Sequence, residues 1–97
     1  LEALMTQEVT ITASADWPAL IVYPKDVWDD LAPQLRRLPS MNRGAREIQR
    51  KMLGMAICFD RSEPLRISEE QRGHADLGQE VVVIVFDTGW AEIWKCE

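Results

Sequence analysis

The sequence predicts a single α+β domain in which two β-hairpins flank a pair of helices. Apolar residues alternate, or run without interruption, in the segments 8–23 and 80–96, and a turn divides each segment. Helical periodicity dominates the region between them, from residue 26 to residue 53. A chain of 97 residues with 46% hydrophobic content can bury one modest core, so we expect one domain over 1–97.

The first elements are a hairpin and a helix. "EVTITAS" (8–14) alternates, "ADWP" supplies a turn, and "ALIVY" (19–23) forms the second strand, which Pro24 ends. Asp26 is expected to cap the following helix, and Pro33 is expected to kink or restart it because proline removes a backbone donor. The helix carries an apolar stripe of Val27, Trp28, Leu31, Leu35 and Leu38.

A second helix is predicted over residues 43–53. Asn42 or Ser40 can cap it, and Gly54 ends it. Ile48 and Met52 lie on one face, where they can pack on a core. A basic face lies elsewhere on the helix, since residues three and four apart are neighbours, and its members are Arg43, Arg46 and Arg50.

The second half begins with an apolar strand, "MAICF" (55–59). "DRSEP" then forms a turn that leads to a short strand at 65–67. Ser68 and Gln71 have the spacing of a capping box, so a short helix is expected to follow. "EVVVIVF" (80–86) is apolar throughout and indicates a strand covered on both faces. "DTG" then turns the chain into a last strand, "WAEIWKC".

An internal repeat relates the two hairpins. Segment 5–23 aligns with segment 77–95 at an offset of 72, and the matched pairs include Gln7 with Gln79, Glu8 with Glu80, Val9 with Val81, Ala19 with Ala91 and Ile21 with Ile93. We therefore divide the domain into an incomplete pseudo-repeat one (1–23), linking helices (24–54) and pseudo-repeat two (55–97). The arm at 55–67 has no counterpart in pseudo-repeat one, which is expected to lack its leading arm.

Charge is distributed unevenly. The formal net charge of −5 argues against broad, non-specific affinity for DNA. Residues 34–53 carry a local charge of +5, which leaves −10 for the rest of the chain and favours docking of a basic segment onto an acidic surface. Cys58 and Cys96 are expected to be buried thiols in a reducing cytoplasm, and no apolar run is long enough to span a membrane.

Two long segments of the chain form a recognisable pattern: "LIVYPKDVWDDLAPQLRRLPSMNRGAREIQRKMLGMA" (20–56) and "ADLGQEVVVIVFDTGWAEIW" (75–94), with "LGQEV" and "EIW" among the most specific motifs. Both segments resemble the MraZ proteins, bacterial regulators of the division and cell-wall gene cluster. The resemblance implies an AbrB-like swapped-hairpin small β-barrel built from two pseudo-repeats. It also implies a cytoplasmic, nucleoid-associated homo-oligomer, assembled as a ring, that binds direct DNA repeats through a turn after each unit's first strand.

That DNA-reading turn departs from the family pattern of Asp-x-x-Gly-Arg followed by an apolar pair and proline. Asp60 matches, but Glu63 replaces the glycine and Pro64 replaces the arginine. Arg61 and Arg66 could act as displaced phosphate contacts, or they could belong to a solvated, ion-paired turn. The basic face of the second helix could follow a DNA backbone, or it could pair charges within the domain or across a subunit boundary.

Two function hypotheses remain open: a sequence-specific DNA-binding regulator of the MraZ type, and a protein-interaction or assembly module that has kept the scaffold and lost DNA binding. The sequence shows no nucleophile and base pair, glycine-rich phosphate loop or paired metal-ligand spacing. We therefore expect no enzyme activity, cofactor, metal or small-molecule substrate. The tryptophans are interpreted as core or interface residues, because they are not spaced as a stacking platform for bases.

Overall fold

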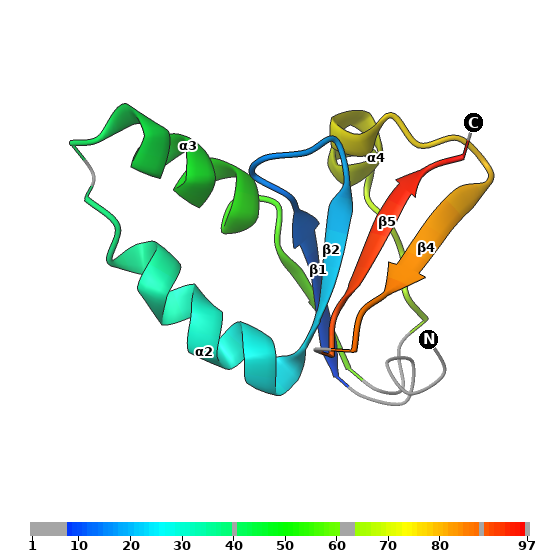
Figure 1. The fold of residues 1–97 in the computed structure, drawn as a ribbon, viewed down its shortest axis with the longest axis horizontal. Coiled ribbons are helices and arrows are strands. Elements are labelled where there is room, and N and C mark those ends of the chain that lie inside the picture. The colour runs from blue at the N-terminus through cyan, green and yellow to red at the C-terminus, as the bar shows by residue number, and fades with distance from the viewer. Residues whose placement is uncertain (1–7, 40, 61–63, 88, 97) are drawn as a thin grey trace.

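The computed structural model describes residues 8–39, 41–60, 64–87 and 89–96, and it confirms a mixed α+β fold. Figure 1 shows a twisted sheet with a helical hairpin projecting from one side and a short helix near the end of two strands. In chain order the elements are β1 (Val9–Ala13), β2 (Leu20–Pro24), α2 (Lys25–Arg36), α3 (Arg43–Met52), β3 (Ile57–Phe59), α4 (Glu69–Ala75), β4 (Val81–Val85) and β5 (Ala91–Lys95).

The sheet has five antiparallel strands in the order β3-β1-β2-β5-β4. Both predicted hairpins are confirmed, because β1 pairs with β2 and β4 pairs with β5. The hairpins join through β2 and β5, where Leu20 lies opposite Ile93 and Val22 lies opposite Ala91. The strand β3 adds to the outer edge of β1, so β1 and β2 lie inside the sheet and β3 and β4 lie at its ends.

The two hairpins correspond closely in position. β1 begins at Val9 and β4 at Val81, which is the offset of 72 found in the sequence, whereas β2 and β5 begin at Leu20 and Ala91, an offset of 71. The connection of the second hairpin is therefore one residue shorter than that of the first. The division into two pseudo-repeats stays a prediction.

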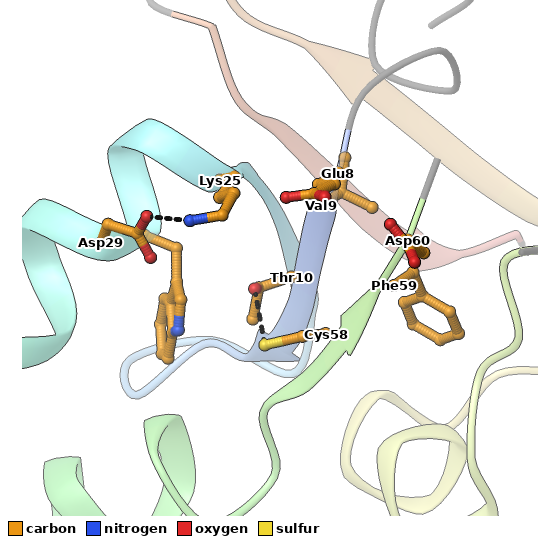
Figure 2. A pocket seen from close by; sticks show the side chains of 9 residues that line it. Glu8, Val9, Thr10, Lys25, Asp29, Cys58, Phe59 and Asp60 are labelled. Carbon is orange, nitrogen blue, oxygen red and sulfur yellow. Dashed lines mark hydrogen bonds and ion pairs between the residues drawn. The ribbon is translucent and has the colours of Figure 1, made fainter. Parts of the chain in front are cut away.

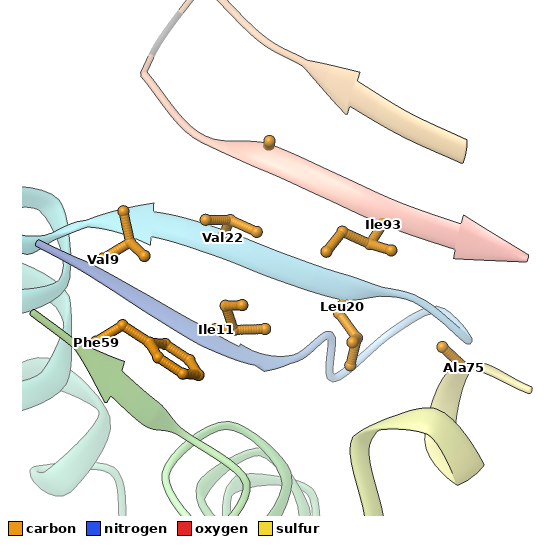
Figure 3. Close-up of a cluster of buried hydrophobic side chains, with 8 residues drawn as sticks. Val9, Ile11, Leu20, Val22, Phe59, Ala75 and Ile93 are labelled. Atoms are coloured by element: carbon orange, nitrogen blue, oxygen red, sulfur yellow. The ribbon is translucent and has the colours of Figure 1, made fainter. Parts of the chain in front are cut away.

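One face of the sheet carries the larger apolar cluster, shown in Figure 3. Its members come from four strands and α4, and they are Val9, Ile11, Leu20, Val22, Phe59, Ala75, Ala91 and Ile93. Leu65, Ile67 and Leu77 pack against this cluster from the segments on either side of α4. Since successive side chains of a strand point to opposite faces, this cluster lies on the face away from α2 and α3.

The helical hairpin covers the opposite face of β1 and β2. Tyr23 from β2 packs with Trp28, Ala32, Leu35 and Met52 from the helices, which confirms most of the predicted apolar stripe. The Tyr23 ring centroid lies 5.9 Å from that of Trp28 and 6.1 Å from that of Trp90, which follows β4 in the second hairpin. Tyr23 therefore joins the helical hairpin to the tip of the second β-hairpin.

Two buried polar side chains form hydrogen bonds that hold helices against β1. The Thr12 hydroxyl donates a short hydrogen bond to the Met52 carbonyl, which holds the last turn of α3 against the sheet. The Gln71 amide donates to the carbonyls of Ile11 and Met55, both at 2.9 Å, which holds α4 against the outer side of β1. Buried polar groups are costly unless they are paired, so these bonds specify where each helix docks.

The helix boundaries test three predicted caps. The Asn42 side chain accepts a hydrogen bond from the amide of Ala45 at 3.1 Å, and Ser68 and Gln71 form the predicted capping box. The prediction for Asp26 is wrong, because the helix begins at Lys25, directly after Pro24, and Asp26 lies in its first turn. The predicted restart at Pro33 is also absent, since α2 continues to Arg36.

Three predictions about burial and local structure are wrong. Residues 80–86 were expected to be covered on both faces, but β4 is an end strand and its side chains are mostly exposed. No strand forms at 65–67, because Leu65 and Ile67 turn inward to the apolar cluster and Pro64 cannot donate to a strand ladder. Both cysteines were expected to be buried, but Cys58 and Cys96 are exposed free thiols.

Candidate nucleic-acid interface

The predicted basic face is present on α3 and is open to solvent. Asn42 fixes the first turn of the helix, and Ala45 and Met52 are buried against the rest of the fold. The remaining face carries the exposed side chains of Arg43, Arg46 and Arg50. Because these positions are three and four residues apart, the guanidinium groups follow one side of the helix, as the spacing predicted.

An ion pair weakens the basic face at one point. The Arg50 guanidinium lies 3.1 Å from the Glu47 carboxylate, and both side chains are more than half exposed. The hydrogen bond from Arg50, together with its charge, lowers the pKa of Glu47 below its ordinary value of 4.5. An exposed pair of this kind contributes little to stability, so Arg50 can exchange Glu47 for another anion.

More positive charge gathers where the two helices meet. Arg36 ends α2 and Arg37 follows it, while Arg43 begins α3, and all three are exposed. Figure 1 shows that this connection lies at the end of the helical hairpin farthest from the sheet. The hairpin thus presents a basic tip and a basic side to solvent in a chain that is acidic overall.

The candidate turn after β3 is only partly within the described residues. Arg61 lies outside them, as does Glu63. Arg66 is exposed between Leu65 and Ile67, which pack against the apolar cluster. Anchoring on both sides therefore holds Arg66 at the surface. Leu65 and α3 contact opposite faces of the sheet, so the structure does not bring Arg66 together with the basic face of α3.

A pocket of about 460 Å³, which the sequence did not predict, opens between β1, β3 and the start of α2 (Figure 2). Glu8, Asp29 and Asp60 line it with one cation, Lys25, which pairs with Asp29. The hydrogen bond and charge of Asp29 raise the pKa of Lys25 above its ordinary value of 10.5. This excess of carboxylates would repel phosphate. The spacing of Lys25 and Asp29 is the one local signal that could have indicated the site.

Within the ranges that the structure describes, no group of three or more His, Cys, Asp or Glu side chains could hold a metal ion. His74, the single histidine, has its ring Nε2 3.1 Å from the Trp17 carbonyl oxygen in the first hairpin turn. No helix among the described residues is long and apolar enough to cross a membrane.

Curated relatives identify the family. No protein-family model matches the chain. Transcriptional regulator MraZ of Marinobacter nauticus is 31% identical over 100 residues, which are 100% of this chain and 66% of the relative. The MraZ of Alkalilimnicola ehrlichii is 32% identical over 101 residues, covering 98% of this chain and 67% of the relative. The MraZ of Pectobacterium carotovorum is 37% identical over 79 residues, which are 79% of this chain and 52% of the relative.

All three relatives carry the name of a transcriptional regulator. The chain belongs to the MraZ family. It spans between about half and two thirds of the length of the curated relatives that it matches. The resemblance predicted from the sequence motifs is confirmed.

Proposed function

We propose that this chain is part of a sequence-specific DNA-binding regulator that acts on division and cell-wall genes as a ring-shaped homo-oligomer in the cytoplasm. The observation that carries the proposal is an exposed basic surface, the face of Arg43, Arg46 and Arg50, on an otherwise acidic member of a family of transcriptional regulators. A ring would repeat weak contacts many times, so avidity would raise the overall affinity of the assembly above that of a single copy. In this proposal the two pseudo-repeats complete an AbrB-like barrel.

The proposal assigns different tasks to the two basic sites. Arg66 is held at the surface by its anchored neighbours and would contact a phosphate from the turn after β3. The α3 face would follow a neighbouring stretch of backbone or dock onto the acidic surface of the next subunit. Each phosphate contact releases counterions, so the logarithm of affinity should fall with the logarithm of salt by about 0.9 per contact.

A fluorescence anisotropy titration with repeat-containing duplex DNA at two salt concentrations tests the proposal. We expect wild-type chain to bind with a steep salt dependence, and Arg66→Ala to reduce the slope by about 1. Replacing Arg43, Arg46 and Arg50 together with alanine should reduce the slope further if α3 contacts DNA. The matched control replaces the same three arginines with lysine, which keeps the charge.

The alternative function is a protein-interaction or assembly module that has kept the scaffold without DNA binding. The exposed apolar strand β4, with 36 to 50% exposure at Val81, Val82, Ile84 and Val85, favours it. No duplex binding tighter than the micromolar range, with oligomers still seen by light scattering, would support this alternative over DNA binding. A monomer at every concentration would contradict both.

A further inference from the structure

The basic face of α3 has one acidic residue within it, Glu47. Between residues 31 and 59 the sequence has six arginine or lysine residues and Glu47 as its single acid. On a helix of about 3.6 residues per turn, Glu47 lies between Arg43 and Lys51 on the solvent side of α3, away from the buried positions of the helix. The carboxylate is therefore inside the cationic surface and not at its border.

Three cations surround this carboxylate. Arg43 lies four residues before Glu47, Arg50 three residues after it and Lys51 four residues after it, and side chains at these spacings are neighbours on a helix. The direct contact comes from Arg50, whose guanidinium lies 3.1 Å from a Glu47 oxygen. The hydrogen bond and charge of Arg50, followed by the charges of Lys51 and Arg43, lower the pKa of Glu47. The carboxylate is thus ionised at neutral pH.

The other two arginines of the face are available to an external anion. Within the part of the chain that the structure describes, neither Arg43 nor Arg46 forms an ion pair with an acidic side chain, and both are exposed. Each can face a phosphate with its full charge. The pair of Arg50 and Glu47 has no net charge, so it attracts a phosphate much less.

The helix that carries this pair is held in place without a ligand. The Gln49 amide donates to the carbonyls of Leu35 and Leu38 at 2.9 and 3.2 Å, which ties α3 to the end of α2. The last turn of α3 is held against β1, as described above. Binding of an anion therefore leaves Glu47 beside Arg50, because both side chains project from one fixed helix.

We propose that Glu47 is a resident competitor for phosphate on the α3 face and withholds Arg50 from a nucleic-acid backbone. Arg50 can turn towards another anion, but the displaced carboxylate stays on the same helix and repels the phosphate that replaces it. The exchange therefore brings no net gain in charge. The inference rests on the proposed function, in which this face follows DNA, and it adds the residue that keeps the contact of each copy weak and reversible.

Fluorescence anisotropy with a duplex of scrambled sequence, titrated at several salt concentrations, tests the inference. Glu47→Gln should bind about fivefold or more tighter at about 0.1 M salt, because Arg50 then neutralises one more phosphate. For the same reason the logarithm of affinity should fall more steeply with the logarithm of salt, by about 0.9. The scrambled duplex is used because backbone contacts do not require a particular sequence.

Glu80→Gln is the matched control. It removes the same charge from an exposed side chain just before β4, on the side of the sheet away from the helical hairpin (Figure 1). This variant should leave the salt slope unchanged. An equal change of slope in Glu47→Gln and Glu80→Gln would overturn the inference, because it would show an effect of net charge alone.

A double-mutant cycle with Arg50→Ala identifies the cation that Glu47 withholds. Arg50→Ala should remove the whole gain in slope from the Glu47→Gln chain, and should reduce the slope of the wild-type chain by less than half as much. An equal reduction in both backgrounds would overturn the inference, since Arg50 would then contact phosphate whether or not Glu47 is present. Circular dichroism verifies that each variant folds.

The inference and the proposed function fail on different results. Equal affinity for scrambled and repeat-containing duplex would contradict sequence-specific binding, whereas the effect of Glu47→Gln on the slope would still support the inference. An unchanged slope in Glu47→Gln would overturn the inference while a preference for the repeats supports the proposed function. No binding of scrambled duplex by either chain at low salt would also overturn the inference, because α3 would then offer no phosphate site.

Discussion

Gln71 is a polar side chain in an apolar setting, and its three hydrogen bonds explain its position. It is 0% exposed, its amide donates to Ile11 and Met55, and its oxygen accepts from the Ser68 amide at 3.1 Å. It therefore links the capping box of α4 to β1. Sequence spacing predicted the capping box but not the bonds to residues far along the chain, because only the fold brings these groups together.

Replacing Gln71 with methionine should destabilise the fold by about 1–3 kcal/mol, because the variant leaves two backbone carbonyls without their donor. Urea unfolding measures the change. Gln34→Met is the control, since the Gln34 amide also donates to a carbonyl, that of Asp30, but at an exposed position. Equal stability of the two variants would show that the buried bonds contribute nothing specific.

Tyr23 is the single tyrosine of the chain, so its ionisation can be followed without overlap. Burial raises its pKa above the ordinary value of 10.0, and the negative charge of Glu92 raises it further. As the pH rises, the phenol of Tyr23 therefore deprotonates in the unfolded chain before it does so in the folded chain. The stability that Tyr23 contributes is therefore complete below pH 10.0 and is lost as the pH rises towards the raised folded pKa.

Ultraviolet titration of tyrosinate should give a pKa above 10.0 in the folded chain and one near 10.0 in denaturant. Glu92→Gln should lower the folded pKa only part of the way, because burial is the larger cause. Glu70→Gln, on the exposed surface of α4, serves as the control and should leave it unchanged. A folded pKa at or below the denatured one would contradict the burial of the phenol.

At the scale of elements, local signals predicted most of what formed. The hairpins, the apolar stripe of α2 and the basic face of α3 depend on periodicity within one element, which is readable from sequence. The errors lie where contacts between distant segments decide the outcome. Leu65 and Ile67 pack against the apolar cluster instead of forming a strand. The pocket around Lys25 is lined by residues from β1 and the start of α2 together with residues 58–60, which are distant in the sequence.

The cap of α3 allows a prediction at this scale. Asn42→Ala should destabilise the fold by about 0.5–2 kcal/mol, because the first turn loses its side-chain acceptor. Asn42→Asp should retain most of the stability, since aspartate is an equally good cap. Chemical unfolding of both variants distinguishes a cap from a surface effect, and equal losses would exclude the capping role.

Across the whole molecule, burial decreases along the sheet from β1 to β4. β1 is buried on both faces and paired on both edges, whereas β4 is paired on one edge and largely exposed. The apolar sequence of β4 led to the wrong prediction of burial on both faces. The apolar composition of a strand shows that its side chains can be buried, but it does not show which segment would bury them.

Hydrogen exchange of the chain alone should follow this gradient. Amides of β1 should exchange slowest and amides of β4 fastest among the four strands that form the hairpins, because opening β4 breaks only one ladder. Mass spectrometry of exchanged peptides measures the order. Equal protection of β1 and β4 in the isolated chain would contradict the arrangement of the sheet.

The position of Tyr23 between Trp28 and Trp90 has an optical consequence. At ring separations of 5.9 and 6.1 Å, light absorbed by the phenol passes to the indoles before it can be emitted. Native chain should thus show almost no tyrosine emission. Tyrosine emission should stay low even when the second β-hairpin and its Trp90 move away, because Trp28 is only five residues from Tyr23 along the chain and still accepts the energy.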